Sequence, residues 1–281
     1  MKTIVMKKYH GLGNDYLVLD PNKNDIHLQE RNIQKLCQRN FGVGADGILY
    51  GPINQDGQIE VLIFNPDGSE AERSGNGVRI FAKYLLDEGY IKDKKFKLKT
   101  KAGLVEIEFL DMIGSQMRVN MGRPDFMSSA IPMAGAEHEI INEPMTFHDS
   151  LYNTTCLSVG NPNCVIMTEK VSPKEVVELG PFVENAPVFP NRMNLQICRV
   201  DNKNELTIEI YERGAGYTLA SGTGACAAAA AAYKLGLVES RVTVHMPGGD
   251  LVIEIEEDGT IYMTGSVTIV GEFRLAENFF A

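Results

Sequence analysis

A four-residue pattern, Ser-Gly-x-Gly, occurs twice in this 281-residue chain and constrains its fold more than any other feature. The two copies, residues 74–77 and 221–224, lie at the same distance after Phe64 and Tyr211, which each end a strand-like segment. Each copy also precedes a helix-like segment, so the order strand, turn, helix is repeated. Such a repeat favours two similar domains that face each other across a pseudo-twofold axis. The alternative is a pair of unrelated glycine-rich helix starts.

The helix predicted over residues 223–235 indicates how each half is built. It consists almost entirely of alanine and has no polar side before Tyr233 and Lys234, so it must be buried on all sides. A strongly curved sheet wrapped around a central helix is the simplest arrangement that achieves this burial. Segments with strand character are plentiful and lie at residues 61–64, 96–100, 104–110, 117–121, 206–211, 241–245, 251–256 and 261–270. A first-half helix is predicted over residues 78–86.

These patterns predict an α+β fold of two pseudo-symmetric domains, each a strongly curved mixed sheet around a central helix. Residues 122–124, Gly-Arg-Pro, are the best candidate for the crossing between domains. The first domain is therefore predicted to span residues 1–122 and the second residues 123–263. The final segment, residues 264–281, is predicted to return to the first domain.

Composition excludes several classes of function. The net charge of −10 and the pI near 5.1 do not suit a nucleic acid or an anionic membrane as partner. No apolar run is long enough for a transmembrane helix, and no secretory signal begins the chain, so a cytoplasmic location is expected. The five cysteines form no CxxC pair and the five histidines no HxH or HxxxH group, so we expect reduced thiols and no bound metal.

The two repeated helix starts are candidate anion sites. Free backbone N–H groups and the positive end of the helix dipole bind an anion there without a basic side chain. Glycines at positions 75, 77, 222 and 224 would let the backbone approach the ligand. A substrate carboxylate fits such a site, and a phosphate is the rival ligand.

Ser74 and Ser221 are the candidate proton-transfer residues. Inversion at a carbon needs one group that removes a proton from one face and another that delivers a proton to the opposite face. Polar residues in turn-like surroundings could hold the rest of a substrate: Asn14, Asn65, Asn161, Asn194, Glu212 and Arg213. Arg213 suits a carboxylate and Glu212 an ammonium group. The alternatives are asparagines that only form turns and a Glu212-Arg213 pair that is only a surface ion pair.

Ordered motifs along nearly the whole chain carry a family resemblance. They are HGLGND (10–15), GVGADG (42–47), FNPDGSEA (64–71), GNG (75–77), MGRP (121–124), GNP (160–162), FPN (189–191) with Asn194, YERG (211–214), GTGAC (222–226) and PGGDL (247–251). Together they resemble the diaminopimelate epimerase family. The resemblance implies reversible interconversion of LL- and meso-diaminopimelate in lysine and peptidoglycan biosynthesis, without pyridoxal phosphate, metal or any other cofactor. It also implies a small-molecule amino-acid substrate and a homodimer.

The resemblance assigns roles to residues position by position. Ser74 and Ser221 fall where the family has its two catalytic cysteines. The α-carboxylate of the reacting centre would be bound by Gly75, Asn76, Gly222 and Thr223. The distal carboxylate would be held by Asn65, Asn161, Asn194 and Arg213. Asn14 and Glu212 fall at other substrate-contacting positions.

The two serines depart from the family in a way that bears directly on the chemistry. A thiol ionises near pH 8.5 and can be activated at a helix start, whereas the pKa of a serine hydroxyl lies several units higher. Three interpretations follow: a Cys→Ser pair that leaves an epimerase able to bind but not to turn over, a silent amino-acid-binding paralogue, or an enzyme that uses serine for another α-proton reaction. Asn163 and Tyr217 replace the family's usual His and Glu, which leaves open a racemase of another amino acid such as histidine.

Overall fold

The computed structural model describes residues 4–26, 28–55, 57–71 and 74–280, and these residues form two compact units. The first unit comprises residues 1–119 and 265–281, and the second comprises residues 120–264. The observed boundaries lie within a few residues of the predicted ones. The chain changes units inside two strands, β8 (Gln116–Gly122) and β17 (Ile261–Ser266), rather than in the Gly-Arg-Pro segment that begins at the last residue of β8.

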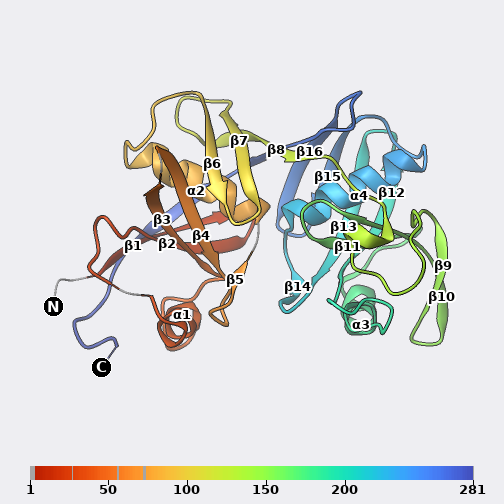
Figure 1. Cartoon of the computed structure of the whole chain (residues 1–281), viewed down its shortest axis with the longest axis horizontal. Coiled ribbons are helices and arrows are strands. Elements are labelled where there is room, and N and C mark those ends of the chain that lie inside the picture. Colours follow the sequence, from red (N-terminus) through yellow and green to blue (C-terminus); the bar gives the residue numbers. More distant parts are fainter. Residues whose placement is uncertain (1–3, 27, 56, 72–73, 281) are drawn as a thin grey trace. The chain divides into compact units, whose positions relative to one another are not determined.

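The first unit is a mixed sheet with two helices (Figure 1). Its strands are β1 (Val5–Gly11), β2 (Asn14–Leu19), β3 (Ile48–Gln55), β4 (Gln58–Phe64), β5 (Glu70–Ala71), β6 (Lys95–Thr100), β7 (Gly103–Phe109), the start of β8, and β18 (Thr268–Arg274), and its helices are α1 (Glu30–Cys37) and α2 (Gly75–Asp87). The strands pair in the order β18-β1-β2-β3-β4-β6-β7-β8, with β5 on β4. The pairs β2–β3 and β4–β6 are parallel and the others antiparallel.

The second unit has the same kind of sheet. Its elements are η1 (Ser128–Ala130), β9 (Glu143–Phe147), β10 (Ser150–Ser158), β11 (Pro162–Met167), α3 (Pro173–Glu184), β12 (Asn194–Asn202), β13 (Glu205–Glu212), β14 (Gly216–Thr218), α4 (Gly222–Lys234), β15 (Arg241–Met246), β16 (Gly249–Ile255) and β17. The strands pair in the order β9-β10-β11-β12-β13-β15-β16-β17, with β14 on β13. Here β11–β12 and β13–β15 are the parallel pairs.

The two pairing orders are the same when the strands are matched one by one across each sheet: β18 with β9, β1 with β10, β2 with β11, and so on to β8 with β17. The parallel pairs fall at matching places, and so do the helices. The helices α1 and α3 precede the matched strands β3 and β12, while α2 and α4 follow the short strands β5 and β14. The repeat inferred from two tetrapeptides therefore extends to the topology of both units, and the predicted α+β class is confirmed.

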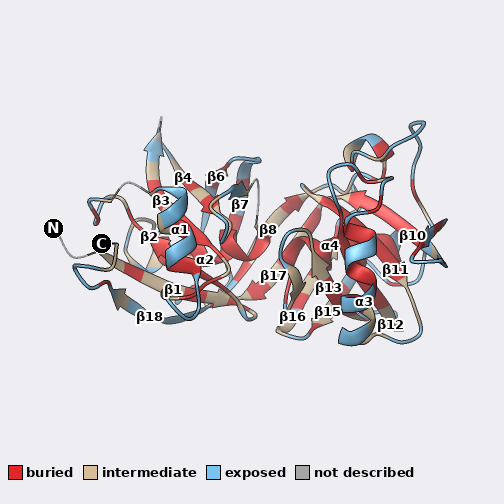
Figure 2. Cartoon of the chain, turned by 90° about the horizontal axis from the view of Figure 1, so that it is seen from below, coloured by how far each residue is buried: buried red, intermediate tan, exposed pale blue. Residues whose placement is uncertain are grey.

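Each unit buries one helix inside its sheet (Figure 2). All residues of α4 from Gly222 to Ala232 are buried, as the alanine run predicts, and the helix packs against strands on several sides, including β10, β13 and β16. The helix α2 is the buried helix of the first unit and carries larger side chains. Among them, the rings of Phe81 and Tyr84 stack with their centroids 5.9 Å apart. Small side chains on α4 allow its strands to approach closely.

Periodicity alone did not predict α1 and α3. Ser172 caps α3 by accepting a hydrogen bond from the backbone N–H of Glu175, and Pro173 occupies the first turn, so a local start signal was present. The predicted single strand over residues 261–270 is divided into β17 and β18. The backbone N–H of Val267, between the two, donates to the carbonyl of Ser115 instead of continuing a strand ladder.

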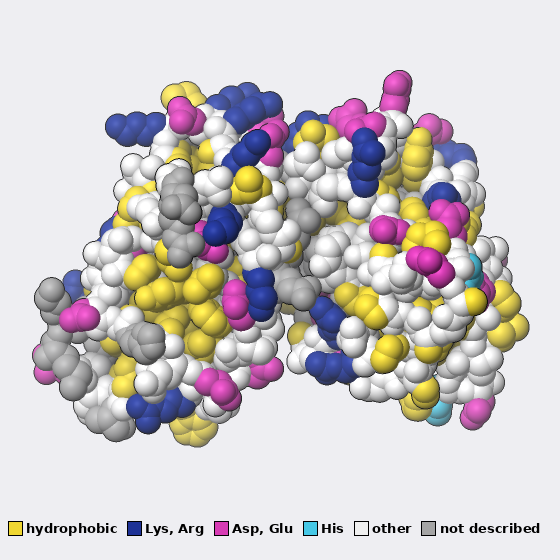
Figure 3. All heavy atoms as spheres, viewed as in Figure 1, with side chains coloured by type: hydrophobic (Ala, Val, Ile, Leu, Met, Phe, Trp, Pro, Cys, Tyr) yellow, Lys and Arg dark blue, Asp and Glu magenta, His cyan; other side chains and the backbone are white. Residues whose placement is uncertain are grey.

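Charged side chains of both signs are interspersed on the face drawn in Figure 3, so this face carries no continuous basic surface. Among the described residues, no helix is both long enough and apolar enough to cross a membrane.

Candidate active site

Ser74 is the N-cap of α2. Its backbone is extended, with φ −136° and ψ 118°, and its hydroxyl oxygen accepts a hydrogen bond from the N–H of Gly77 at 3.0 Å. A Cβ atom on Gly77 would lie 3.1 Å from the Cβ of Ser74 and 3.2 Å from its Oγ. Glycine at this position therefore relieves a tight contact with the serine side chain that folds back over the first turn.

Ser221 caps α4 in the same way. Its angles are φ −134° and ψ 120°, and its Oγ accepts from the N–H of Gly224 at 3.2 Å. A Cβ atom on Gly224 would again lie 3.1 Å from the Cβ of the serine, and 3.0 Å from Nε2 of Gln196. The two Ser-Gly-x-Gly copies thus form the same structure, a serine N-cap closed over a glycine at the start of a buried helix.

The side chains that contact the two serines differ. The hydroxyl of Tyr16, on β2, donates to Ser74 Oγ at 3.1 Å. Ser221 Oγ instead donates to Oε2 of Glu212 at 3.0 Å, while Oε1 of Glu212 accepts from the hydroxyl of Thr218 at 2.7 Å. One serine therefore meets a phenol, and the other meets a carboxylate that a second hydroxyl holds in place.

In the first unit, the structure brings Asn14 and Asn76 together close to the start of α2. Asn76 is buried at 2% exposure and donates from Nδ2 to Oδ1 of Asn14 at 3.1 Å. Oδ1 of Asn76 accepts from Arg79, which lies one turn further along the helix and is fully buried. Asn65 lies in the turn between β4 and β5, where its Nδ2 donates to Ser69 Oγ at 3.0 Å, so its amide supports the turn.

In the second unit, amide side chains lead toward Ser221. Asn161 donates from Nδ2 to the hydroxyl of Thr223 at 3.1 Å, and the Thr223 oxygen lies 3.4 Å from Ser221 Oγ. Asn163 donates to Oδ1 of Asn161 at 2.9 Å and itself accepts from Gln196 at 3.2 Å. Asn163, one of the two departures from the family pattern, therefore controls the orientation of a predicted substrate-binding amide.

Asn194 and Arg213 form a separate contact in the second unit. Asn194 is buried at 3% exposure, accepts from the backbone N–H of Arg213 at 2.9 Å and donates to the carbonyl of Pro162 at 2.7 Å. The guanidinium of Arg213 donates to the carbonyl of Asn191 at 3.2 Å. Asn194 thus connects the starts of β11 and β12 with the turn after β13.

The second departure, Tyr217, has a structural contact. Its hydroxyl donates to Glu209 at 2.9 Å, and its ring packs against the hydrophobic cluster that includes α3. Burial, followed by the Glu209 carboxylate, raises the pKa of Tyr217 to about 12, and burial raises the pKa of Glu209.

The described part of the chain contains no group of three or more His, Cys, Asp or Glu side chains arranged to hold a metal ion. Cys226 is fully buried in α4.

Tyr16, Thr218, Gln196 and Asp46 are the neighbours of the site that sequence reasoning missed. Tyr16 and Gln196 lie on strands that only the packed structure brings near the helix starts, whereas Thr218, on β14, lies three residues before Ser221. Asp46 lies in the GVGADG motif, which signalled a functional segment without indicating which residue acts.

Comparison with known proteins identifies relatives over the whole chain. The family model described as diaminopimelate epimerase matches residues 6–127 and 155–270. A protein of Nostoc sp. named diaminopimelate epimerase 2 is 46% identical over 275 residues, covering 98% of this chain and 96% of that protein. Diaminopimelate epimerase of Moorella thermoacetica is 39% identical, covering 95% of this chain and 98% of the relative.

Solved structures share the fold at low sequence identity. A hydroxyproline epimerase from Agrobacterium vitis superimposes with a TM-score of 0.74 at 14% identity, covering 100% of this chain and 93% of the other. A probable proline racemase from Agrobacterium radiobacter gives a TM-score of 0.71 at 15% identity, with coverage of 98% and 93%.

Proposed function

The chain belongs to the diaminopimelate epimerase family of isomerases, which act in lysine biosynthesis without pyridoxal phosphate, and we propose that it binds diaminopimelate at its two serine-capped helix starts. The observation that carries this proposal is the pair of matching N-caps at Ser74 and Ser221. A two-base inversion needs one proton-transfer group for each face of the substrate carbon, and the chain offers one such position in each unit.

In this proposal, the backbone N–H groups in the first turns of α2 and α4 bind the α-carboxylate of the substrate. The first helical residues after each serine, Gly75 with Asn76 and Gly222 with Thr223, are buried. An anion there interacts with backbone N–H groups and with the helix dipole, which contributes about 0.3–1 kcal/mol or more where the site is partly buried. In this proposal Asn161, Asn194 and Arg213 bind the distal part of the substrate.

Serine at both proton-transfer positions lowers the expected rate. Each pKa unit corresponds to about 1.4 kcal/mol, or roughly tenfold in the population of the ionised form, and a hydroxyl lies several units above a thiol. We therefore propose that the chain binds its substrate but turns it over far more slowly than relatives that carry thiols at these positions.

The contacts define how protons would move in this residual reaction. Loss of the α-proton to Ser221 Oγ is balanced by transfer of the serine's own proton to Oε2 of Glu212. Delivery of the Ser74 proton to the opposite face of the carbon is balanced by transfer of the Tyr16 hydroxyl proton to Ser74 Oγ. The step leaves Glu212 protonated and Tyr16 ionised, so one proton must pass from Glu212 to Tyr16 through solvent before the next turnover. The other stereoisomer reacts by the reverse sequence, which starts from ionised Tyr16 and protonated Glu212.

Isothermal titration calorimetry of the unaltered protein tests the binding step. We expect meso- and LL-diaminopimelate to bind, and chromatographic assay on a chiral column to detect little or no interconversion. Tighter binding of histidine would instead indicate a changed substrate, for which the Asn163–Asn161 contact would be responsible. Binding of inorganic phosphate but of no amino acid would contradict the proposal.

A further inference from the structure

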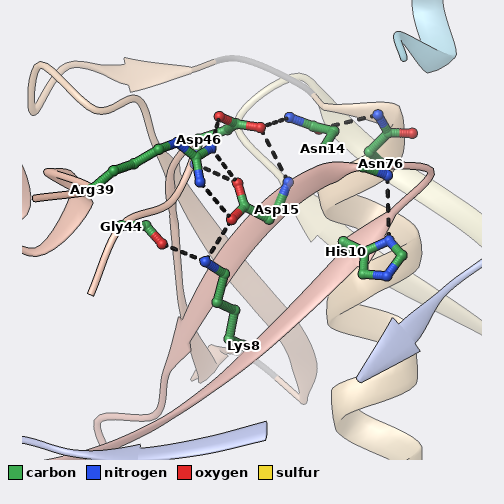
Figure 4. Close-up of polar contacts among 9 residues, drawn as sticks. Lys8, His10, Asn14, Asp15, Arg39, Gly44, Asp46 and Asn76 are labelled. Carbon is green, nitrogen blue, oxygen red and sulfur yellow. Dashed lines mark hydrogen bonds and ion pairs between the residues drawn. The ribbon is translucent and has the colours of Figure 1, made fainter. Parts of the chain in front are cut away.

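A line of four side chains in the first unit connects a carboxylate to a guanidinium through two amides. Asn14 Nδ2 donates to Oδ2 of Asp46 at 2.9 Å (Figure 4). Asn76 Nδ2 donates to Oδ1 of Asn14 at 3.1 Å, and Arg79 donates to Oδ1 of Asn76 at 2.7 Å. Hydrogen bonds therefore run in one direction, from Arg79 to Asp46.

The two charged ends determine how both amides face. An asparagine amide can be turned so that its oxygen and nitrogen exchange places, and only its neighbours decide between the two arrangements. A carboxylate only accepts hydrogen bonds, so the nitrogen of Asn14 must face Asp46. A guanidinium only donates, so the oxygen of Asn76 must face Arg79. Between these ends, only one orientation of each amide places a donor opposite an acceptor in all three contacts.

Asp46 is itself held from two sides. Its Oδ1 accepts from Arg39 at 2.7 Å, and its Oδ2 accepts from the backbone N–H of Asp15 at 3.2 Å. In return, the N–H of Asp46 donates to Oδ1 of Asp15 at 3.1 Å, while Arg39 contacts both carboxylate oxygens of Asp15. Figure 4 shows Asp46 placed between Arg39 and Asn14 as a result of these contacts.

We infer that Asp46, held by Arg39, is a positioning residue of the amino-acid site: it sets the orientation of the Asn14 amide and, through it, supports that of Asn76. The inference rests on the proposed function, in which Asn14 and Asn76 contact the substrate. Among the described contacts, the Asn14 amide donates once and accepts once, which leaves one hydrogen and one lone pair on defined sides. An α-amino acid offers the matching acceptor and donor, its carboxylate and its ammonium group.

The variant Asp46→Asn tests the orientation. The new amide can meet Asn14 with either its oxygen or its nitrogen, so Asn14 is no longer constrained from this side, and the contact with Arg39 is weakened. We expect meso-diaminopimelate to bind about three- to tenfold more weakly by calorimetry, as for loss of one oriented hydrogen bond. Unchanged affinity would overturn the inference.

A double-mutant cycle separates positioning from general stability. If Asp46 acts through Asn14, Asp46→Asn in an Asn14→Ala background should change the affinity less than about twofold. An equal loss in both backgrounds would overturn the inference. The matched control is Asp111→Asn, because Asp111 also lies in the first unit and accepts hydrogen bonds from the backbone of Ile113, Ser115 and Gln116. This control should lower the melting temperature and leave binding unchanged.

A readout without ligand keeps the inference separate from the proposed function. In ¹⁵N-labelled protein, the side-chain amide signals of Asn14 are identified by their loss in Asn14→Ala. We expect Asp46→Asn to shift these signals and Asp111→Asn to leave them in place. If the unaltered protein binds no diaminopimelate, the proposed function fails. If the Asn14 signals do not respond to Asp46→Asn, the inference fails.

Discussion

Ser74 and Ser221 cap α2 and α4 with almost the same backbone angles, yet the first serine contacts the phenol of Tyr16 and the second the carboxylate of Glu212. The supports differ as well. Charged side chains orient the amides beside Ser74, whereas the amides leading to Ser221 begin at Gln196, a neutral side chain. The two units thus share the same backbone at the start of the buried helix, while the side chains that contact each serine differ.

The largest expected effect comes from removing the carboxylate beside Ser221. In a protein carrying Ser74→Cys and Ser221→Cys, we expect Glu212→Gln to lower the rate of α-proton exchange about 10²- to 10⁴-fold, as for loss of an acid–base group. Exchange of deuterium from solvent, followed by proton NMR, measures this rate. A loss below tenfold would mean that the carboxylate is not what distinguishes the two serines.

The charged support of the first unit should appear in the pH dependence of stability. Burial alone would raise the pKa of Asp15, but hydrogen bonds from Arg39 and Lys8 outweigh it and hold the pKa below its usual value of 3.8. Ionised Asp15 therefore stabilises the fold above that pH, and the stabilisation is lost as the pH falls through the lowered pKa. We expect Asp15→Asn to lower the free energy of unfolding by about 1.5–3 kcal/mol at pH 7.

Urea unfolding between pH 7 and pH 2 measures this contribution. The difference between Asp15→Asn and the unaltered protein should shrink below about pH 4, whereas the exposed residue Asp25, changed to Asn, should produce little difference at any pH. A difference for Asp15→Asn that stays constant down to pH 2 would contradict the assigned contacts.

Removing the hydroxyl beside Ser74 should have a smaller effect than removing the carboxylate beside Ser221. Tyr16→Phe deletes one hydrogen bond to Ser74 Oγ and keeps the buried ring. In the doubly cysteine-substituted background we expect about a three- to tenfold slower exchange. A loss as large as that for Glu212→Gln would show that the two partners are equivalent in function.

The smallest effect is expected at Gln196. Its Oε1 is buried without a hydrogen-bond partner among the described residues, while its Nε2 donates to Asn163. In Gln196→Leu, loss of one hydrogen bond is offset by removal of the unpaired oxygen. The free energy of unfolding, measured by thermal denaturation, should therefore change by less than about 1 kcal/mol. A decrease in the free energy of unfolding above about 2 kcal/mol would indicate that Gln196 contributes as much to stability as the charged side chains of the first unit.

The sequence predicted the features that depend on local pattern and composition. The alanine run predicted a helix buried on all sides, and the two Ser-Gly-x-Gly copies predicted matching helix starts. Both predictions depend only on residues that are close together in the sequence. The last eighteen residues were predicted to return to the first half, and β18 pairs with β1 there.

The partner of Ser74 could not be predicted, because it comes from a strand distant in the sequence, whereas Glu212, the partner of Ser221, lies nine residues before that serine and was a predicted site residue. Tyr16 lies 58 residues before Ser74, and packing of β2 against α2 brings its hydroxyl to the start of the helix. The line from Asp46 to Arg79 likewise joins a loop, a strand end and a helix. Motifs marked these segments, but the direction of each hydrogen bond follows only from the packed structure.

Deuterium exchange at the α-carbon of meso-diaminopimelate in deuterated water tests the central claim most directly. We predict that the unaltered protein binds the compound but exchanges its α-proton several powers of ten more slowly than the Ser74→Cys/Ser221→Cys protein. Exchange by the unaltered protein within tenfold of the cysteine variant would contradict the account, and so would a cysteine variant that binds the compound without exchanging its proton.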